Sequence, residues 1–251
     1  MGETDGSESI VFARLKIDQW AAYSFQPETP DTLIAVGRSS IPTEAAASTA
    51  TLPSMLRRRV TPVGKTAFRA SCDLTIPTHA RFIFCSRHGE FERTLRILTA
   101  LAANEPVSPA DFSLSVHNGL AGLLSSALRN PTGHTAIAAG PASFGSALIE
   151  AAACLIDEPD QPVLLVYYDE GLPAPYNEIA GENDSCIALA MLLVSTQHDA
   201  GEVIFELTQR EGVPMTASST DEARAFLDFL EMRNTREPTD LTSSQWRWRR
   251  A

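Results

Sequence analysis

The chain of 251 residues has little positive charge: 20 Lys and Arg stand against 31 Asp and Glu, a formal net charge of −11. Proteins that bind the phosphate backbone carry a basic surface, so this composition argues against a nucleic-acid partner. Long hydrophobic runs are lacking too, because the longest, residues 187–194, falls short of the ~20 residues of a membrane span. The acidic start, MGETDGSES, resembles neither a secretory signal nor a transit peptide. We therefore expect a soluble, cytoplasmic chain without a membrane span.

Cysteine is also scarce. The four cysteines show no CxxC or Cys/His ligand spacing, and they are Cys72, Cys85, Cys154 and Cys186. We expect buried thiols in a reducing compartment and predict neither a disulfide framework nor a metal site. No GxGxxG or Walker-type loop is present, so the sequence does not support a nucleotide cofactor.

Apolar residues are plentiful, at 44% of the chain, which is enough for a sizeable core. From residue 66 onward, helix-like and strand-like patterns alternate, which is typical of a layered α/β unit with a mixed, mainly parallel sheet. We predict helices at residues 66–72, 89–103, 118–128, 143–156 and 220–232. We predict strands at residues 9–23, 81–85, 134–139, 162–168, 185–194 and 202–207. The first strand is predicted to lie at a sheet edge, and the apolar run 162–168 in the covered middle.

Two segments lie outside this alternation. Residues 26–65, rich in Pro, Ser, Thr and Ala, are predicted to be a long surface excursion. This segment carries a basic cluster that is either a solvated turn or a docking patch for an acidic partner, namely Arg57, Arg58 and Arg59. Residues 246–250, with the sequence WRWRR, are predicted to be an exposed aromatic-basic tail.

A strand, a tight turn and a helix follow one another in residues 133–156, with Gly140 and Pro141 at the turn. This order predicts a nucleophile elbow, which presents a side chain to a cleft beside backbone N–H groups and the positive end of a helix. Ala142 and Ser143 compete for the elbow position. Ser143 is either a nucleophile or a helix-capping residue, and the first glycine of a GxSxG motif is absent.

The same stretch resembles the β-ketoacyl synthase branch of the thiolase fold, in which a Gly-Pro opens a strand and an Ala-Cys elbow precedes a small-x-Gly helix start. A gap-free match of Gly133 and Gly145 to that family's glycines brings its nucleophilic cysteine onto Ala142. Residues 116–123 resemble the family's Asn-x-x-x-Gly segment, and residues 84–89 resemble its glycine-bearing loop beside the acyl tunnel. The resemblance implies a thiolase-like αβα unit that corresponds to the first half of a ketosynthase.

The departures from that family concern its catalytic residues. Ala142 has no thiol, so the acyl-enzyme step of the family cannot occur there. The family's catalytic histidines come from a second half, whereas the chain beyond the resembling stretch, residues 66–195, holds one histidine, His198. Both the nucleophile and the acid/base residues of a ketosynthase are therefore missing.

One truncated domain over residues 1–251 is implied, with a core at about 66–208 and a helical, Trp/Arg-rich tail at 209–251. Short chains of this kind resemble the chain-length-factor subunits of aryl polyene (xanthomonadin-type) clusters, and the likeness is carried by residues 52–59, 86–89, 112–118 and 246–250. Such a subunit is non-catalytic and forms a heterodimer with an active β-ketoacyl-ACP synthase, whose acyl tunnel it shapes. The substrate is held by that partner or by a phosphopantetheinyl acyl carrier protein, so no cofactor is expected on this chain.

The resemblance also predicts which residues line the tunnel or the partner interface. They are Arg87, His88, Phe91, Leu95, Phe112, His117, Asn118 and Phe144. Core packing is the alternative for the apolar members, and a structural, hydrogen-bonded role is the alternative for His117. The three arginines at 57–59 are predicted to attract the acidic carrier protein. A helix without a second half to cover it also predicts exposed apolar surface, and hence a partner.

An independent enzyme is the competing hypothesis. Ser143 would be the nucleophile of a hydrolase or acyltransferase, with His198 or His117 as its base. This hypothesis predicts an acyl-ester that Ser143→Ala abolishes, and reaction with a fluorophosphonate probe.

Overall fold

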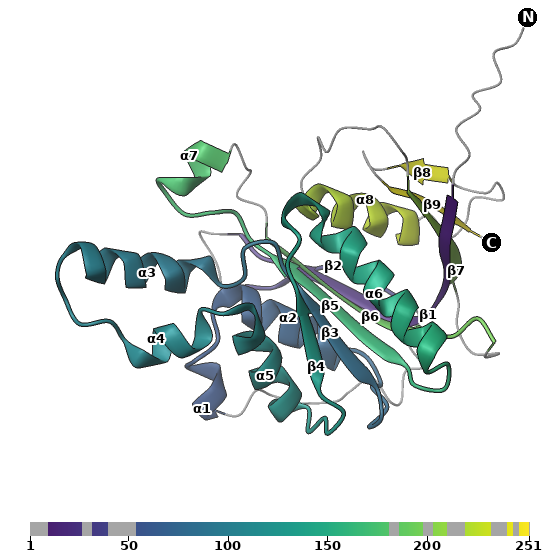
Figure 1. Cartoon of the computed structure of the whole chain (residues 1–251), viewed down its shortest axis with the longest axis horizontal. Coiled ribbons are helices and arrows are strands. Elements are labelled where there is room, and N and C mark those ends of the chain that lie inside the picture. Colours follow the sequence, from purple (N-terminus) through teal and green to yellow (C-terminus); the bar gives the residue numbers. More distant parts are fainter. Residues whose placement is uncertain are drawn as a thin grey trace, which may run out of the picture.

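The computed structural model describes residues 10–26, 32–39, 54–180, 186–197, 203–209, 219–231, 240–242 and 246–250. The strands of these segments form one mixed sheet in the order β4-β3-β5-β6-β1-β7-β9-β8, with β2 paired to β1 (Figure 1). Their bounds are β1 Ile10–Ser24, β2 Ile34–Arg38, β3 Arg81–Cys85, β4 His134–Ile137, β5 Val163–Asp169, β6 Ile187–Val194, β7 Val203–Gln209, β8 Asp240–Thr242 and β9 Trp246–Arg250.

The sheet has a parallel part and an antiparallel part. Strands β4, β3 and β5 are parallel, and helices connect them along the chain. The β5–β6, β6–β1 and β1–β7 pairs that continue the sheet are antiparallel. The predicted mixed α/β sheet is confirmed. The parallel pairing that was predicted is found among β4, β3 and β5.

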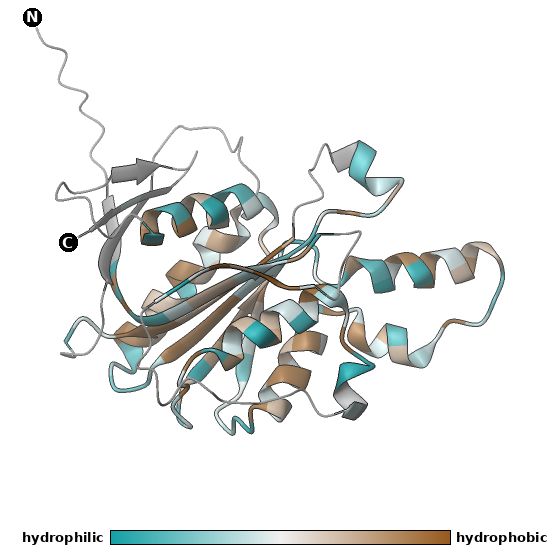
Figure 2. Ribbon diagram, turned by 180° about the vertical axis from the view of Figure 1, so that it is seen from behind, coloured by the Kyte–Doolittle hydropathy of each residue, from teal (hydrophilic) through white to brown (hydrophobic). Residues whose placement is uncertain are grey.

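Helices cover both faces of the sheet, α2 and α5 on one face and α6 and α8 on the other (Figures 1 and 2). The helices are α1 Ser54–Arg57, α2 Pro62–Cys72, α3 Phe91–Ala102, α4 Pro109–Leu114, α5 His117–Ala127, α6 Ser143–Asp157, α7 Tyr176–Ala180 and α8 Ser219–Glu231. Every residue of β5 and β6 is buried, as their continuous apolar runs predict for strands covered on both faces. Helix α2 begins four residues before the predicted start, because Thr61 caps it and Pro62 suits its first turn.

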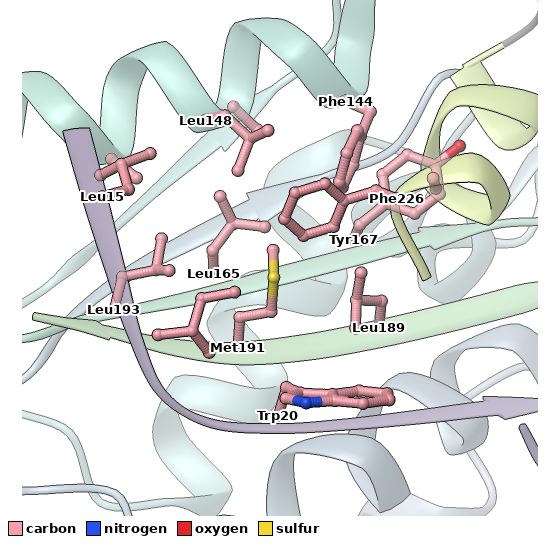
Figure 3. Close-up of a cluster of buried hydrophobic side chains, with 14 of the residues drawn as sticks. Leu15, Trp20, Phe144, Leu148, Leu165, Tyr167, Leu189, Met191, Leu193 and Phe226 are labelled. Atoms are coloured by element: carbon pink, nitrogen blue, oxygen red, sulfur yellow. The ribbon is translucent and has the colours of Figure 1, made fainter. Parts of the chain in front are cut away.

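The core on the α6 side is built from aromatic contacts. Figure 3 shows Phe144 of α6 and Phe226 of α8 side by side, and their ring centroids lie 5.4 Å apart. Phe144 also meets Tyr167 of β5 edge to face at 5.3 Å. Helix α8 covers the apolar face of α6 and leaves Phe144, Leu148 and Ala151 fully buried.

The first strand is not an edge strand. Residues 10–17 of β1 pair with β7, residues 16–23 pair with β6, and Ala21–Ser24 pair with β2. Three register shifts interrupt the alternation of the β1 side chains between the two faces of the sheet. In the sequence, the polar residues among the apolar ones suggested a half-exposed edge strand. The prediction was wrong because both neighbours of β1 come from distant parts of the chain.

Residues 26–65 are more structured than predicted. They contain β2, which pairs with β1, the short helix α1 and the first turn of α2. Ser39 ties the end of β2 to β1, since its backbone N–H donates to the Trp20 carbonyl at 2.9 Å. Residues 40–53 lie outside the described residues.

The predicted exposed tail is instead strand β9, which pairs with β7 on one side and β8 on the other. Trp248 has 0% of its surface exposed and meets Phe226 edge to face at 5.4 Å. The alternation of Trp and Arg in WRWRR is the two-residue period of a strand, so the signal was present but was interpreted as surface.

Replacing Trp248 is expected to lower stability strongly. Trp248→Ala leaves a large cavity beside Phe226, so the free energy of unfolding should fall by about 3–5 kcal/mol in urea titrations. Leu101→Ala, at a side chain that is 57% exposed, is the control and should change stability by less than about 0.5 kcal/mol. Equal, small effects of both variants would contradict the core position of Trp248.

Candidate functional site

The candidate site lies at the edge of the sheet where parallel strands β3, β4 and β5 end. Their last residues are neighbours, and the Ser86 N–H donates to the Ile137 carbonyl at 3.2 Å. The loop 86–90, the turn 138–142 and the segment 170–176 therefore leave the sheet at one edge. Ligand sites of α/β proteins are found at such carboxyl edges.

The loop after β3 is held tightly. Gly89 has a φ of +63°, which favours glycine, and its N–H donates to Ser86 Oγ at 2.7 Å. The Ser86 hydroxyl in turn donates to Asp169 Oδ1 at 3.4 Å. A Cβ at Gly89 would meet the His117 ring at 3.6 Å, so the loop rests directly on the start of α5.

Three basic side chains share this corner. Burial, with the charge of Arg87 and the ring of His117 nearby, lowers the pKa of His88 to about 4, so His88 is neutral at pH 7. The Nε2 atom of His117 is buried and has no hydrogen-bond partner among the described residues. The His88 ring also lies 6.4 Å from the ring of Phe91, which meets Tyr176 edge to face at 5.1 Å.

Two acids lie at the end of β5, Asp169 as its last residue and Glu170 directly after it. Burial raises the pKa of Asp169 to about 6, although it accepts hydrogen bonds from the backbone of His88 and from the Tyr167 hydroxyl. Burial, with repulsion from Glu92 and other acids, raises the pKa of Glu170 to about 8. Glu170 therefore holds its proton at neutral pH.

The turn between β4 and α6 has the strand–turn–helix shape that was predicted. Gly140 has a φ of +57° and begins the short 3₁₀ turn Gly140–Ala142. The buried Ser143 hydroxyl donates to the Gly140 carbonyl at 2.6 Å and accepts from the Ala139 N–H at 2.9 Å. Both bonds close the turn, which favours the structural interpretation of Ser143. The proposed base His198 lies outside the described residues.

Helices α3 and α4, which we call the arm, project from the body of the molecule (Figures 1 and 2). Large apolar side chains on and beside these two helices are exposed, and they are Leu98, Leu101, Phe112 and Val116. Phe112 is the most exposed of them, at 66%. Monomeric proteins seldom expose a contiguous apolar surface without a binding role.

The structure brings together four of the predicted site residues: Arg87, His88, Phe91 and His117. Leu95 is half-buried one turn further along α3, and Phe112 lies exposed on α4. Asn118 is exposed on the first turn of α5. Phe144 is a core residue on the other face of the sheet and takes no part in this cluster.

Arg57, Arg58 and Arg59 are exposed at the end of α1. The guanidinium of Arg93 on α3 donates to the Arg59 carbonyl, so the basic turn is tied to the arm. Sequence reasoning missed Arg93, its partner Glu90, and the acids after β5. Polar residues directly after a buried strand are a recognisable signal for Asp169 and Glu170, but a buried arginine in a surface-like helix has none.

Within the part of the chain that the structure describes, no three His, Cys, Asp or Glu side chains gather as metal ligands. The helices described there are all too short or too polar to cross a bilayer.

A family described as "Beta-ketoacyl synthase, N-terminal domain" matches residues 33–249. Among solved structures, a ketosynthase in complex with its chain length factor from Xenorhabdus doucetiae has a chain with 28% identity and a TM-score of 0.71, covering 94% of this chain and 99% of that one. The ishigamide ketosynthase/chain length factor has 13% identity and a TM-score of 0.56, covering 86% and 73%. A β-ketoacyl synthase from Burkholderia phymatum has 15% identity and a TM-score of 0.53, covering 87% and 70%. No curated protein matches.

Stability is expected to fall as pH rises from 6.5 to 8. The pKa of Glu170 rises from 4.5 to about 8 on folding, so in this range the folded state binds more protons at Glu170 than the unfolded state. His88, whose pKa falls from 6.5 to about 4, opposes this loss by only about 0.4 kcal/mol, and Asp169, whose pKa rises to about 6, adds less than that to it. In urea titrations we expect the free energy of unfolding to fall by about 1–2 kcal/mol over this pH range. We expect Glu170→Gln to remove this fall. Glu105→Gln, at an exposed acid that is not among the charges acting on Glu170, is the control and should keep the slope. Equal slopes in wild type and E170Q would refute the assignment.

Ser143 is expected to be unreactive. Wild-type protein incubated with a fluorophosphonate should gain no mass at Ser143, and Ser143→Ala should cost about 1–2 kcal/mol of stability through the lost turn bonds. Ser146→Ala, one turn away on the same helix, serves as the matched control for both measurements. A probe adduct that maps to Ser143 would restore the independent-enzyme hypothesis.

Proposed function

Because the chain belongs to the β-ketoacyl synthase N-terminal domain family, we propose that it is a non-catalytic chain-length-factor subunit. It pairs with an active β-ketoacyl-ACP synthase and shapes the acyl tunnel during aryl polyene or polyketide-type chain elongation. The observation that carries the proposal is the turn at Ala142, which keeps the strand–turn–helix form but offers a methyl group in place of a thiol.

The chemistry of the turn supports a role without catalysis. The one hydroxyl beside Ala142, that of Ser143, is buried and bonded to the Gly140 and Ala139 backbone. His88 is neutral at pH 7, and its ring packs against that of Phe91. The hydroxyl beside Ala142 is thus held by the turn, which supports a role for it in structure rather than as a nucleophile.

The comparison with the Xenorhabdus doucetiae complex supports the partner. The match covers nearly all of both chains, so the matched chain has about the length of this one. That complex consists of a ketosynthase and its chain length factor. We propose the corresponding heterodimer for this chain, in which the ketosynthase supplies the nucleophile and the catalytic histidines.

Two exposed features would form the partner surface. Strand β4 lies at the end of the sheet, and among the described residues no strand pairs with its outer side (Figure 1). An open edge of this kind accepts a strand from another chain. The apolar arm projects from the same side of the molecule, and together the two features provide backbone pairing and apolar burial.

The tunnel would be shaped where the arm meets the sheet edge. Arg87, His88, Phe91 and His117 gather there, and Leu95 and Phe112 extend the surface along the arm. Asn118 would face the partner, and the core residue Phe144 would support the start of α6 from within.

The growing chain would be carried by a phosphopantetheinyl acyl carrier protein, so this subunit needs no cofactor of its own. Arg57, Arg58 and Arg59 are exposed and adjacent to the arm, where their charge would attract an acidic carrier.

Co-purification and elongation assays test the proposal. We expect this chain and its cognate ketosynthase to form a stable heterodimer that extends malonyl-carrier protein, while neither protein does so alone. Phe112→Asp should weaken the heterodimer by about tenfold or more, because it adds a charge to the apolar arm. Ile156→Asp, at a side chain that is 74% exposed at the far end of α6, is the matched control and should have no effect.

Other results would overturn the proposal. A chain that binds no ketosynthase and hydrolyses or transfers acyl groups by itself is an enzyme in its own right. Equal weakening by F112D and I156D would exclude the arm from the interface.

A further inference from the structure

A buried ion-pair network lies where the arm joins the body of the molecule. Its centre is Arg93, on the first turn of α3. Only 6% of the Arg93 surface is exposed. Its Nε donates to Glu90 Oε2 at 2.7 Å, its Nη1 donates to Asp111 Oδ1 at 3.2 Å, and its Nη2 donates to the Arg59 carbonyl. One guanidinium therefore joins three separate segments of the chain.

Glu90 connects this network to helix α2. Its Oε1 accepts from the backbone N–H of Thr61 at 3.2 Å and from the Thr61 hydroxyl, and Thr61 is the N-cap of α2. A Cβ at Gly64, in the first turn of α2, would come within 3.1 Å of the same oxygen. The base of α3 is thus fixed to the start of a body helix through a buried carboxylate.

Asp111 connects the network to α4. It accepts from Arg93 and, at 2.8 Å, from Nη2 of Arg96, which also pairs with Glu92 at 3.2 Å. The hydrogen bond from Arg96, with that from Arg93, holds the pKa of Asp111 below its usual range, so Asp111 is charged at neutral pH. The two helices of the arm are therefore locked to each other and to the body through the same few side chains.

Beyond this network, ring contacts of Phe91 with Tyr176 and His88 hold the first turn of α3. Its main packing neighbour is α4, and its outer half bears the exposed Leu98 and Leu101. Buried ion pairs are weak evidence for stability, since apolar replacements are often as stable, and their best-attested role is to specify one geometry. The network's three-way geometry is suited to that role.

We propose that Arg93 is a positioning residue that sets the angle of the arm, and through it the length of the chain that the heterodimer makes. This inference rests on the proposed function. Arg93 itself touches no substrate, because its guanidinium is enclosed by Glu90, Asp111 and the Arg59 carbonyl.

The length of α3 makes the angle matter. Leu101 lies eight residues beyond Arg93, about 12 Å along the helix at the usual rise. A tilt of about 10° at the base would move Leu101 by about 2 Å, which exceeds a carbon–carbon bond of about 1.5 Å. A small loosening at Arg93 is thus enough to change where a tunnel closed by the arm would end.

Three variants test the inference in the heterodimer with its cognate ketosynthase. Arg93→Met keeps an unbranched, apolar stem but removes the guanidinium with all three donor nitrogens, and Arg93→Lys keeps the charge without the planar fork. Arg96→Met is the matched control, because it removes an arginine that is 44% exposed from the same carboxylate and leaves the Arg93 contacts intact. The readouts are the product-length distribution, the total rate of two-carbon addition and the heterodimer affinity.

We expect R93M to spread the product lengths over at least one additional elongation cycle in each direction, with the total rate changed by less than about threefold. R93K should restore part of the wild-type distribution, and R96M should keep it. Hydrogen exchange of the isolated chain should be about tenfold faster at residues 94–114 in R93M and unchanged in β5, since only the arm is released.

Several outcomes would overturn the inference. Faster exchange in the arm without any change of product length would show that the arm angle does not set chain length. If R93M and R96M change the product lengths equally, the loss of one positive charge beside Asp111 explains both results, and Arg93 has no positioning role of its own. If R93M fails to fold, Asp111→Asn, which weakens only the α4 end of the network, must spread the product lengths, and unchanged lengths would refute the proposal.

Failure of the proposed function has a different signature. A wild-type chain that neither binds nor assists the ketosynthase would refute that function. The hydrogen-exchange comparison of the isolated chain would then still decide whether Arg93 holds the arm.

Discussion

Strands β5 and β6 are buried on both faces along their whole length, and the rest of the structure is arranged around this burial. Alternate residues of each strand enter two separate cores, one under α2 and α5 and the other under α6 and α8. A sheet of this kind is stable only if helices cover both faces. Helix α8 and strand β9 complete the second core, since Phe226 and Trp248 lie in it beside Phe144. The chain thus covers its own central helix α6 with α8.

Because the faces are sealed, polar and exposed apolar groups collect at the sheet edge and on the arm. Arg87, His88 and the buried acids lie at the carboxyl ends of β3 and β5, and His117 lies beside them at the start of α5. Helices α3 and α4 carry the exposed Leu98, Leu101 and Phe112. Raised pKa values at Asp169 and Glu170 follow from their burial at this edge.

Periodicity predicted the longer helices and the strands between residues 66 and 231, because apolar spacing reports directly which face is buried. It missed the short helices α4 and α7. The same spacing on α3 correctly predicted a helix, but it could not tell that Leu98 and Leu101 face away from the body. The sequence also could not tell whether β1 lies at the edge or in the interior of the sheet. The two strands that place it in the interior, β6 and β7, lie more than 160 residues further along the chain. Arg93 gave no signal at all, because its burial depends on Glu90, Asp111 and a backbone carbonyl meeting in space.

The sequence by itself determined the α/β class, the strand–turn–helix at residues 134–157 and the identity of Ala142 at its turn. These properties depend on local periodicity and on the identity of single residues. Only the tertiary structure decided that α8 covers α6, that the WRWRR segment is a strand, and that the arm stands away from the body on a buried ion-pair network. Each of those depends on contacts between segments far apart in the chain, and their free energy has no local pattern in the sequence.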